Sequence, residues 1–337
     1  MKIIRQLLIG ILFCMMIVSS ITPVTGTIFI KSFQSQIKGN IFYVGGSGPG
    51  NYTTIQDGVD NASVGDIVFV YQGIYYENVR INKSISLLGE NQMLTIIDGQ
   101  EAGGHIVSIL APAVTLEQFT LRNSGGIPNA AALYINSDQN KIEEIIITCT
   151  AYHGEEGIWL SQSVGNLLSR NTVENYHYGI WLENSDYNNL FNNTIINSWD
   201  WAIILGNSDE NILYGNNITE NNGGVYLRDS NENTFLENDL RTNDRDIALV
   251  DWDATSANNF IGKNNIGLAT FIAAKHSQNK NVWDENYWGR SLNHPKLIIG
   301  QKIFLFFPGA PFHFPPLALT IPWFTVDWHP AQQPYDI

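Results

Sequence analysis

Apolar and polar residues alternate in the middle of the chain, in blocks that repeat at a nearly constant interval. One block begins Gly157-Ile158-Trp159-Leu160, and its copies begin at Gly179, Ala202 and Gly224. The intervals between these starts are 22, 23 and 22 residues. Within a block the apolar residues recur with a period of two, which is typical of strands. Short strands in a repeat of this length predict an all-β solenoid, a parallel β-helix with one coil per block.

The polar residues of the blocks support strands joined by tight turns. Asn makes up about a tenth of the chain and Gly 29 residues, and both tolerate left-handed backbone conformations. No block contains a helical run, and propeller blades need about 40 residues. Two Asn positions recur in every block, and we expect each set to stack as a structural ladder of side-chain amides. These sets are Asn166, Asn188, Asn211 and Asn233, and Asn171, Asn193, Asn216 and Asn238.

The two ends of the repeat differ from its middle. Residues 41–104 contain a short helical pattern, residues 54–62, followed by strand-like runs, and we expect an N-terminal cap and the first coils there. Residues 105–283 form the repeats of the β-helix. Residues 284–337 are rich in aromatic residues and Pro, and we expect this tail to pack over the last coil or along its side.

Residues 1–26 have the pattern of an export signal. Lys2 and Arg5 precede an apolar run, residues 7–21, and small residues follow. A cleaved signal is the favoured interpretation, and an uncleaved N-terminal membrane anchor is the alternative. The protein is therefore expected outside the cell or on its surface, contacting the membrane only if this segment stays attached. Basic residues total 18 against 32 acidic ones, a net charge of −14, which excludes nucleic acid as the expected partner.

The entry into the repeat resembles a known family. The segments are Ile55-Gln56, Gly65-Asp66, Gly73-Ile74-Tyr75-Tyr76-Glu77-Asn78-Val79 and Ile96-Ile97-Asp98-Gly99. Together with the repeats they resemble the NosD-type group of exported proteins, with carbohydrate-binding and sugar-hydrolase-like repeats, over about residues 41–290. The resemblance implies a right-handed parallel β-helix. It leaves the activity open, because the group includes copper-site maturation factors and polysaccharide-active enzymes. The closing residues 327–337 resemble an ending found in related archaeal surface proteins.

Stacking of the coils predicts which residues become neighbours. Two residues after each block start, the side chain should point outward, and this column reads Tyr134, Trp159, Trp181, Ile204 and Tyr226. An exposed aromatic stripe about 20 Å long would match an oligosaccharide, whose sugar faces stack on rings. Arg228 lies beside it. In the alternative interpretation, the tail or an insertion covers the stripe and makes it a second core.

A second column lies two residues before each block start. It contains Glu155, His177 and Asp200, and Glu183 projects from the same sheet face. Carboxyl groups and an imidazole at this spacing could transfer protons or hold a cation such as calcium. A lyase would use a base such as Arg228. The alternative is an ordinary solvated turn, and a one-residue slip would turn these side chains away.

The residues do not favour a copper site. Met93 is the one Met outside the export segment, Cys149 the one Cys, and no two His residues have a ligand spacing. We therefore expect no metal and no cofactor, with calcium as the exception that the acidic column would accommodate. The leading interpretation is a non-catalytic surface protein that binds polysaccharide or a surface glycan. A polysaccharide hydrolase or lyase is the alternative, and a NosD-like periplasmic accessory factor for metalloenzyme maturation is the third.

Overall fold

The computed structural model describes residues 39–125, 129–149, 154–250, 256–267, 272–274, 281–292, 294–307 and 317–337. The chain divides into two compact units, Met1–Asn40 and Ile41–Ile337, and the fold below is that of the second unit. The predicted export segment, residues 1–26, lies outside the described residues. None of the helices in the described ranges is both long and apolar enough to cross a membrane.

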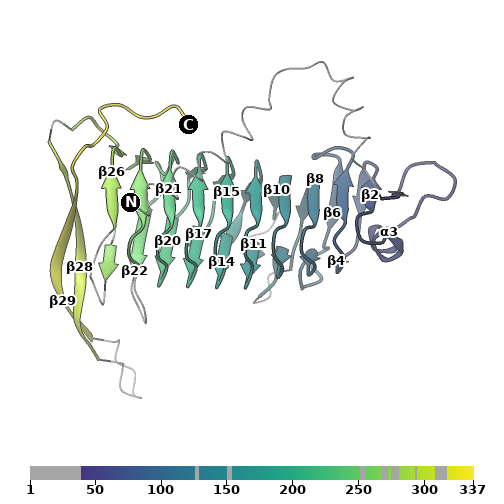
Figure 1. Ribbon diagram of the computed structural model, residues 1–337, viewed down its shortest axis with the longest axis horizontal. Helices are drawn as coiled ribbons and strands as arrows, with labels where there is room; N and C mark the ends of the chain where they lie inside the picture. Colours follow the sequence, from purple (N-terminus) through teal and green to yellow (C-terminus); the bar gives the residue numbers. More distant parts are fainter. Residues whose placement is uncertain are drawn as a thin grey trace. The chain divides into compact units, whose positions relative to one another are not determined.

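Ile41–Ile337 folds as a parallel β-helix, which confirms the predicted fold class (Figure 1). From Asn140 to Asn281, equivalent backbone positions on neighbouring coils are 22 to 26 residues apart. Sheet A contains β1 (Ile41–Val44), β2 (Ile67–Val70), β3 (Gly73–Tyr75), β5 (Ser86–Gly89), β6 (Thr95–Asp98), β8 (Thr115–Arg122), β10 (Lys141–Thr148), β12 (Leu167–Ser169), β13 (Thr172–Glu174), β15 (Asn189–Phe191), β16 (Thr194–Ile196), β18 (Ile212–Tyr214), β19 (Asn217–Thr219), β21 (Thr234–Leu236), β23 (Phe260–Gly262) and β26 (Val282–Asp284).

Sheet B forms the other long wall of the coils. It contains β4 (Val79–Ile81), β7 (Val107–Ile109), β9 (Ala131–Ile135), β11 (Gly154–Ser161), β14 (Tyr176–Glu183), β17 (Trp201–Gly206), β20 (Gly223–Arg228), β22 (Arg245–Val250), β25 (Ile272–Ala274), β28 (Lys296–Phe307) and β29 (Leu317–Asp327). Two further short strands, β24 (Asn265–Ile266) and β27 (Tyr287–Trp288), pair with each other. The apolar residues that alternate along sheet B point inward, so that Ile158, Ile180 and Ile203 stack with 0% exposure.

Single residues with a left-handed backbone turn the chain at the corners of the coils. Arg170, Asn192 and Glu237 occupy one corner on different coils, with φ of 55°, 53° and 54°. The residue that follows each of them points inward and is Asn on every one of these coils, for example Asn171 and Asn193. The abundance of Asn therefore has a structural cause at these corners.

The inward Asn side chains form the predicted amide ladders. Asn193 Oδ1 accepts hydrogen bonds from the backbone N–H and the side-chain Nδ2 of Asn171, both at 3.0 Å. Its Nδ2 donates to Leu168 O and to Asn216 Oδ1, also at 3.0 Å. The second ladder, through Asn166, has the same geometry. Each amide thus ties coils together where the sheet hydrogen bonds are interrupted by the turn.

The predicted N-terminal helix is present as α3 (Ile55–Asn61) and lies at one end of the stack of coils (Figure 1). Thr54 is its N-cap, and its Oγ1 accepts from Asp57 N at 3.1 Å. The Glu77 carboxylate accepts from two more free N–H groups of the first turn, Ile55 N at 2.8 Å and Gln56 N at 2.9 Å. The helix places buried Ile55 and Val59 against the first coil.

A hairpin of β28 and β29 lies at the opposite end. β28 pairs with β25 in parallel and β29 pairs with β28 antiparallel, so the hairpin extends sheet B. Asp327, at the end of β29, has 0% exposure. Its Oδ2 accepts from Asn286 N at 3.1 Å, Asn286 Nδ2 at 3.2 Å and Trp288 Nε1 at 3.0 Å. A carboxylate therefore occupies the next rung of the Asn ladder and closes it.

The ladder predicts a large cost for one missing amide. In Asn193→Ala, four hydrogen bonds are lost and the Asn171 N–H and Leu168 carbonyl stay buried without a partner. We expect the free energy of unfolding to fall by about 2–4 kcal/mol, measured by urea denaturation. Asn217→Ala, at an exposed Asn on β19, is the control, with an expected change below about 0.5 kcal/mol. Equal effects in the two variants would contradict a stabilising ladder.

The closing carboxylate gives a second prediction. Asp327→Ala removes every acceptor on the last rung, and we expect hydrogen exchange of the Asn286 and Trp288 N–H groups to accelerate by at least tenfold. Asp327→Asn keeps one oxygen acceptor and should protect these groups far better. Asp336→Ala, at an exposed carboxylate near the end of the chain, should leave exchange unchanged. Unaltered exchange in Asp327→Ala would show that the hairpin closes the ladder without this carboxylate.

Candidate functional site

The predicted aromatic column is in register on the outer face of sheet B. Strand pairing makes Tyr134, Trp159 and Trp181 direct neighbours on β9, β11 and β14. Ile204 and Tyr226 continue the row on β17 and β20. The four aromatic residues are half-buried and Ile204 is buried, so the row is less exposed than the sequence predicts. We call these five residues the aromatic row.

The rings of the aromatic row stack on one another. The centroids of Trp159 and Trp181 are 5.9 Å apart with an interplanar angle of 23°, and Tyr134 meets Trp159 at 5.1 Å. His105, which the sequence did not single out, stacks on Tyr134 at 4.3 Å and extends the row. Burial lowers the pKa of His105, which favours a neutral imidazole there. Because neighbouring rings cover each other's faces, the outer surface of the row is formed by ring edges, while the Nε1 atoms of Trp159 and Trp181 are buried.

A second row lies beside the first on the same strands. It consists of two parts: Glu156 is in register with Tyr178 on β11 and β14, and Trp201, Gly223 and Arg245 are in register on β17, β20 and β22. The two rows pack together, and their buried members form a cluster separate from the core of the coils. That cluster is Trp201, Ile204, Ala248 and Val250, with Tyr178, Trp181 and Tyr226 partly buried against it.

The outer face therefore has an apolar cluster of its own, as the alternative interpretation of the stripe anticipated. The tail does not explain it in the part of the chain that the structure describes. β28 and β29 continue sheet B beyond β25, at its edge, and so extend the wall that carries the rows. The longest insertion between the repeats, residues 148–156, lies beside the stripe, and its residues 150–153 lie outside the described residues.

The polar column of the sequence prediction forms the rim of this face. Glu155 and His177 come together, with Oε2 and Nδ1 3.2 Å apart. Asp200 instead accepts from Arg245 at 3.3 Å, and the Arg245 guanidinium lies 4.6 Å from the Trp201 ring centroid. The structure thus makes two polar pairs on the rim where the sequence predicted one continuous column.

Glu183 and Arg228 lie on the other side of the aromatic row. Their positions are in register with Gly206 between them, on β14, β17 and β20. Arg228 Nη2 lies 3.1 Å from the place where a Cβ would stand on Gly206. The absence of a side chain at Gly206 therefore lets the guanidinium of Arg228 lie across the middle strand.

Glu156 is the residue that the sequence prediction missed. It is 3% exposed, and burial, followed by the charges of Glu155 and Glu183, raises its pKa to about 7. Its Oε2 and the Nε1 atoms of Trp159 and Trp181 are buried and have no hydrogen-bond partner among the described residues. The column one residue after Glu155, which reads Glu, Tyr, Trp, Gly and Arg, was the available signal.

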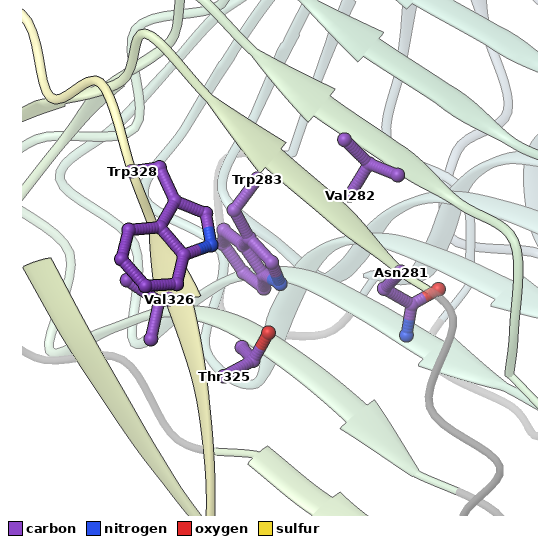
Figure 2. A pocket seen from close by; sticks show the side chains of 6 residues that line it. All are labelled: Asn281, Val282, Trp283, Thr325, Val326 and Trp328. Carbon is purple, nitrogen blue, oxygen red and sulfur yellow. The ribbon is translucent and has the colours of Figure 1, made fainter. Parts of the chain in front are cut away.

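A pocket of about 380 Å³ lies near the C-terminal end, between β26 and the end of β29 (Figure 2). Its lining is Asn281, Val282, Trp283, Thr325, Val326 and Trp328. The indole rings of Trp283 and Trp328 both line it (Figure 2). None of these lining side chains is ionisable, so the pocket offers contacts for binding and no acid–base group.

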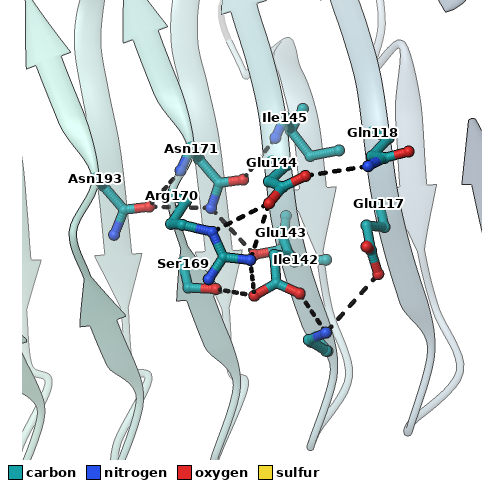
Figure 3. A network of polar contacts seen from close by, with 11 residues as sticks. Glu117, Gln118, Ile142, Glu143, Glu144, Ile145, Ser169, Arg170, Asn171 and Asn193 are labelled. Atoms are coloured by element: carbon teal, nitrogen blue, oxygen red, sulfur yellow. Dashed lines mark hydrogen bonds and ion pairs between the residues drawn. The ribbon is translucent and has the colours of Figure 1, made fainter. Parts of the chain in front are cut away.

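Sheet A carries a network of charged side chains (Figure 3). Glu143 is 7% exposed and pairs with Lys141, with Arg170 at 2.8 Å and with Ser169 Oγ at 2.8 Å. Burial alone would raise the pKa of Glu143, but these partners lower it below its ordinary value. Arg170 also pairs with Glu144 at 2.9 Å. Cations and carboxylates satisfy each other here, which indicates a structural network.

Metal ligands do not gather in the described part of the chain. No three His, Cys, Asp or Glu side chains among the described residues lie together in a way that could hold a metal ion. Cys149 is buried, and His105 stacks on Tyr134. These residues do not fit the soft-ligand set that a copper site requires. The calcium ion that the acidic column suggested stays a prediction.

Comparisons with known proteins agree with the fold. The enzymatically active domain of tailspike protein 2 from bacteriophage CBA120 matches with a TM-score of 0.58 and 12% identity, over 77% of this chain and 41% of that chain. The Dettilon tailspike protein matches with a TM-score of 0.52 and 12% identity, over 74% of this chain and 62% of that chain. At these identities the similarity is one of fold.

Two further matches are based on the sequence and not on the fold alone. A probable pectinesterase/pectinesterase inhibitor 17 from Arabidopsis thaliana is 30% identical over 118 residues, which are 32% of this chain and 23% of that protein. The chain thus spans about a quarter of this relative. The family model described as periplasmic copper-binding protein (NosD) matches residues 59–293, more than half of the chain. The chain belongs to the NosD family of parallel β-helix proteins, as its repeats and its entry segment suggested.

Proposed function

We propose that this protein binds a glycan along the outer face of sheet B. The observation that carries the proposal is the aromatic row, in register over five strands, with polar side chains on both sides. Five strands span about 20 Å at the usual strand spacing, which suits several sugar rings of an extended chain. Tyr134, Trp159, Trp181 and Tyr226 provide ring edges, and Arg228 provides hydrogen-bond donors beside them.

The comparisons support a glycan as the partner. The Arabidopsis relative is named as a pectinesterase, although the matched part is 23% of that protein. The periplasmic description of the NosD family supports export, and we place the protein outside the cytoplasmic membrane or on the cell surface. A copper-related accessory function has less support, because the described residues offer no set of metal ligands.

A polysaccharide hydrolase is the second candidate. The observation that favours it is Glu156, whose pKa of about 7 suits a carboxylic acid that gives up a proton near neutral pH. Glu155 pairs with His177 on the rim, and the charges of Glu155 and Glu183 contribute to the raised pKa of Glu156, so that one buried and two partly exposed carboxyl groups belong to sheet B. Hydrolysis of a glycosidic bond uses such a pair, one as acid and the other as base or nucleophile.

Loss of the central rings gives the test of glycan binding. We expect Trp159→Ala/Trp181→Ala to weaken binding at least tenfold, because each aromatic contact contributes about 0.5–1.5 kcal/mol beyond its area. Isothermal titration calorimetry against neutral and acidic polysaccharides measures the dissociation constant. Phe191→Ala/Tyr214→Ala is the matched control, since these rings pair on the outer face of sheet A at 6.1 Å.

Three outcomes decide between the candidates. Binding that is lost in the Trp159/Trp181 variant and kept in the Phe191/Tyr214 variant supports the proposed surface. New reducing ends in the same mixtures would favour the hydrolase. Binding that both variants lose equally, or no binding to any polysaccharide, would contradict a glycan site on sheet B.

A further inference from the structure

We propose that the far end of the β28–β29 hairpin inserts into the surface of a lipid bilayer. The surface concerned is the pairing of residues 303–307 with residues 317–320, which we call the apolar ribbon. This inference goes beyond glycan binding, because the apolar ribbon and the aromatic row are different parts of the chain. The ribbon gives the protein a contact with a membrane in which the export segment takes no part.

The apolar ribbon extends past the strand that joins it to sheet B. β25 pairs with β28 from Gly300 to Lys302, whereas β29 continues beside β28 as far as Phe307. In the described part of the chain, residues 303–307 therefore have β29 as their one strand partner. Figure 1 shows the hairpin reaching beyond the neighbouring coils on the side where β28 ends and β29 begins. A two-stranded ribbon has no core of its own, so its faces need a partner.

Both faces of the ribbon consist of apolar residues. Successive residues of a strand lie on opposite faces, so a strand with one solvated face alternates apolar and polar residues. The ribbon lacks this alternation, since its strands read Ile303-Phe304-Leu305-Phe306-Phe307 and Leu317-Ala318-Leu319. The pairing shifts between Ile303 and Leu305, but Phe304 is apolar too, so the shift brings no polar residue onto either face. An apolar surface of this kind marks a site of interaction.

The residues around the ribbon have the order that is typical of a segment entering a bilayer surface. Residues 303–326 contain no Asp, Glu, Lys or Arg, although 15% of the whole chain is charged. Lys302 precedes this run and Asp327 follows it. Trp323 pairs with Gly300, so Trp323 and Lys302 both lie at the level of β25. Trp is enriched at the boundary between lipid and water, where Lys also keeps its charge in water.

A lipid surface fits the ribbon better than a second copy of the chain does. A copy packed on one face would leave the other face, equally apolar, in water, whereas lipid surrounds both. A copy that adds a strand would have to pair along β29, where Pro322 has no N–H to offer. The ribbon also has open edges with unpaired backbone groups, which excludes spanning the hydrocarbon core. The insertion is therefore shallow, about 5–10 Å deep.

The test follows one position of the ribbon in the full chain. Cys14→Ser/Thr320→Cys carries an environment-sensitive nitrobenzoxadiazole dye at residue 320 and is titrated with phosphatidylcholine vesicles, while Cys149 is buried from the dye. We expect the emission to rise at least twofold and to be quenched by spin-labelled lipid. Cys14→Ser/Val64→Cys is the matched control, because Val64 is 74% exposed and follows α3 at the opposite end of the coils. Its dye should not respond, even if residues 7–21 bind the vesicles.

A pair of opposite charges tests whether the apolar residues make the contact. Leu305 and Leu319 lie opposite each other, so Leu305→Lys/Leu319→Glu places a compensating ion pair across the ribbon and keeps its strands paired. We expect the partition coefficient of the labelled chain to fall at least tenfold, because burial of charge in lipid costs free energy. Ile74→Lys/Ile96→Glu, at paired positions of β3 and β6 where Ile74 is 47% exposed, should leave it unchanged.

Four results would overturn the lipid contact. The first is unchanged emission at residue 320 in the chain that keeps Leu305 and Leu319, a result that does not depend on the folding of the charged variant. The second is equal partitioning of the charged variant and the chain that keeps both Leu residues. The third is loss of the signal in 1 M NaCl, which would show an electrostatic contact. The fourth is a signal that rises with protein concentration without vesicles, together with a dimer in analytical ultracentrifugation, which would identify a second copy as the partner.

Discussion

The hydrogen bonds of the inward Asn amides fix the register of the coils between Asn140 and Asn286, and the outer face of these coils depends on that register. Each rung both accepts and donates, so Asn193 joins the backbone of Asn171 and Leu168 to the side chain of Asn216. A slip by one residue would leave several of these groups buried and unpaired. Because the corners cannot slip, outward residues of successive coils meet as direct neighbours.

The same chemistry explains how the solenoid ends. An Asn amide passes the ladder on because it has a donor for the next acceptor, whereas a carboxylate can only accept. Asp327 takes the position of the next Asn and satisfies the N–H groups of Asn286 and Trp288. The hairpin that carries Asp327 then extends sheet B with an antiparallel pair. Asn therefore continues the ladder from one coil to the next, and Asp ends it.

The sequence predicts the parts of this protein that follow from two periods, the interval of 22 or 23 residues between blocks and the alternation of apolar residues within a block. The spacing of the blocks predicted the coils, the Asn ladders and the register of Tyr134, Trp159 and Trp181. The sequence did not identify Glu156 as a site residue, because the alternation of inward and outward side chains is interrupted next to it. A Cβ on Gly157 would lie 2.4 Å from Val173, so Gly157 points inward together with Ile158, and the phase of the strand before it shifts.

The contacts of Asp327 and Arg245 could not be predicted for a different reason. Each is made between residues far apart in sequence that no repeat relates, Asp327 with Asn286 and Arg245 with Asp200. Burial of Glu156 likewise depends on the bulky neighbours that the coils bring beside it. A solenoid held rigidly at its corners can keep such an acid, and two indole N–H groups, in place without partners.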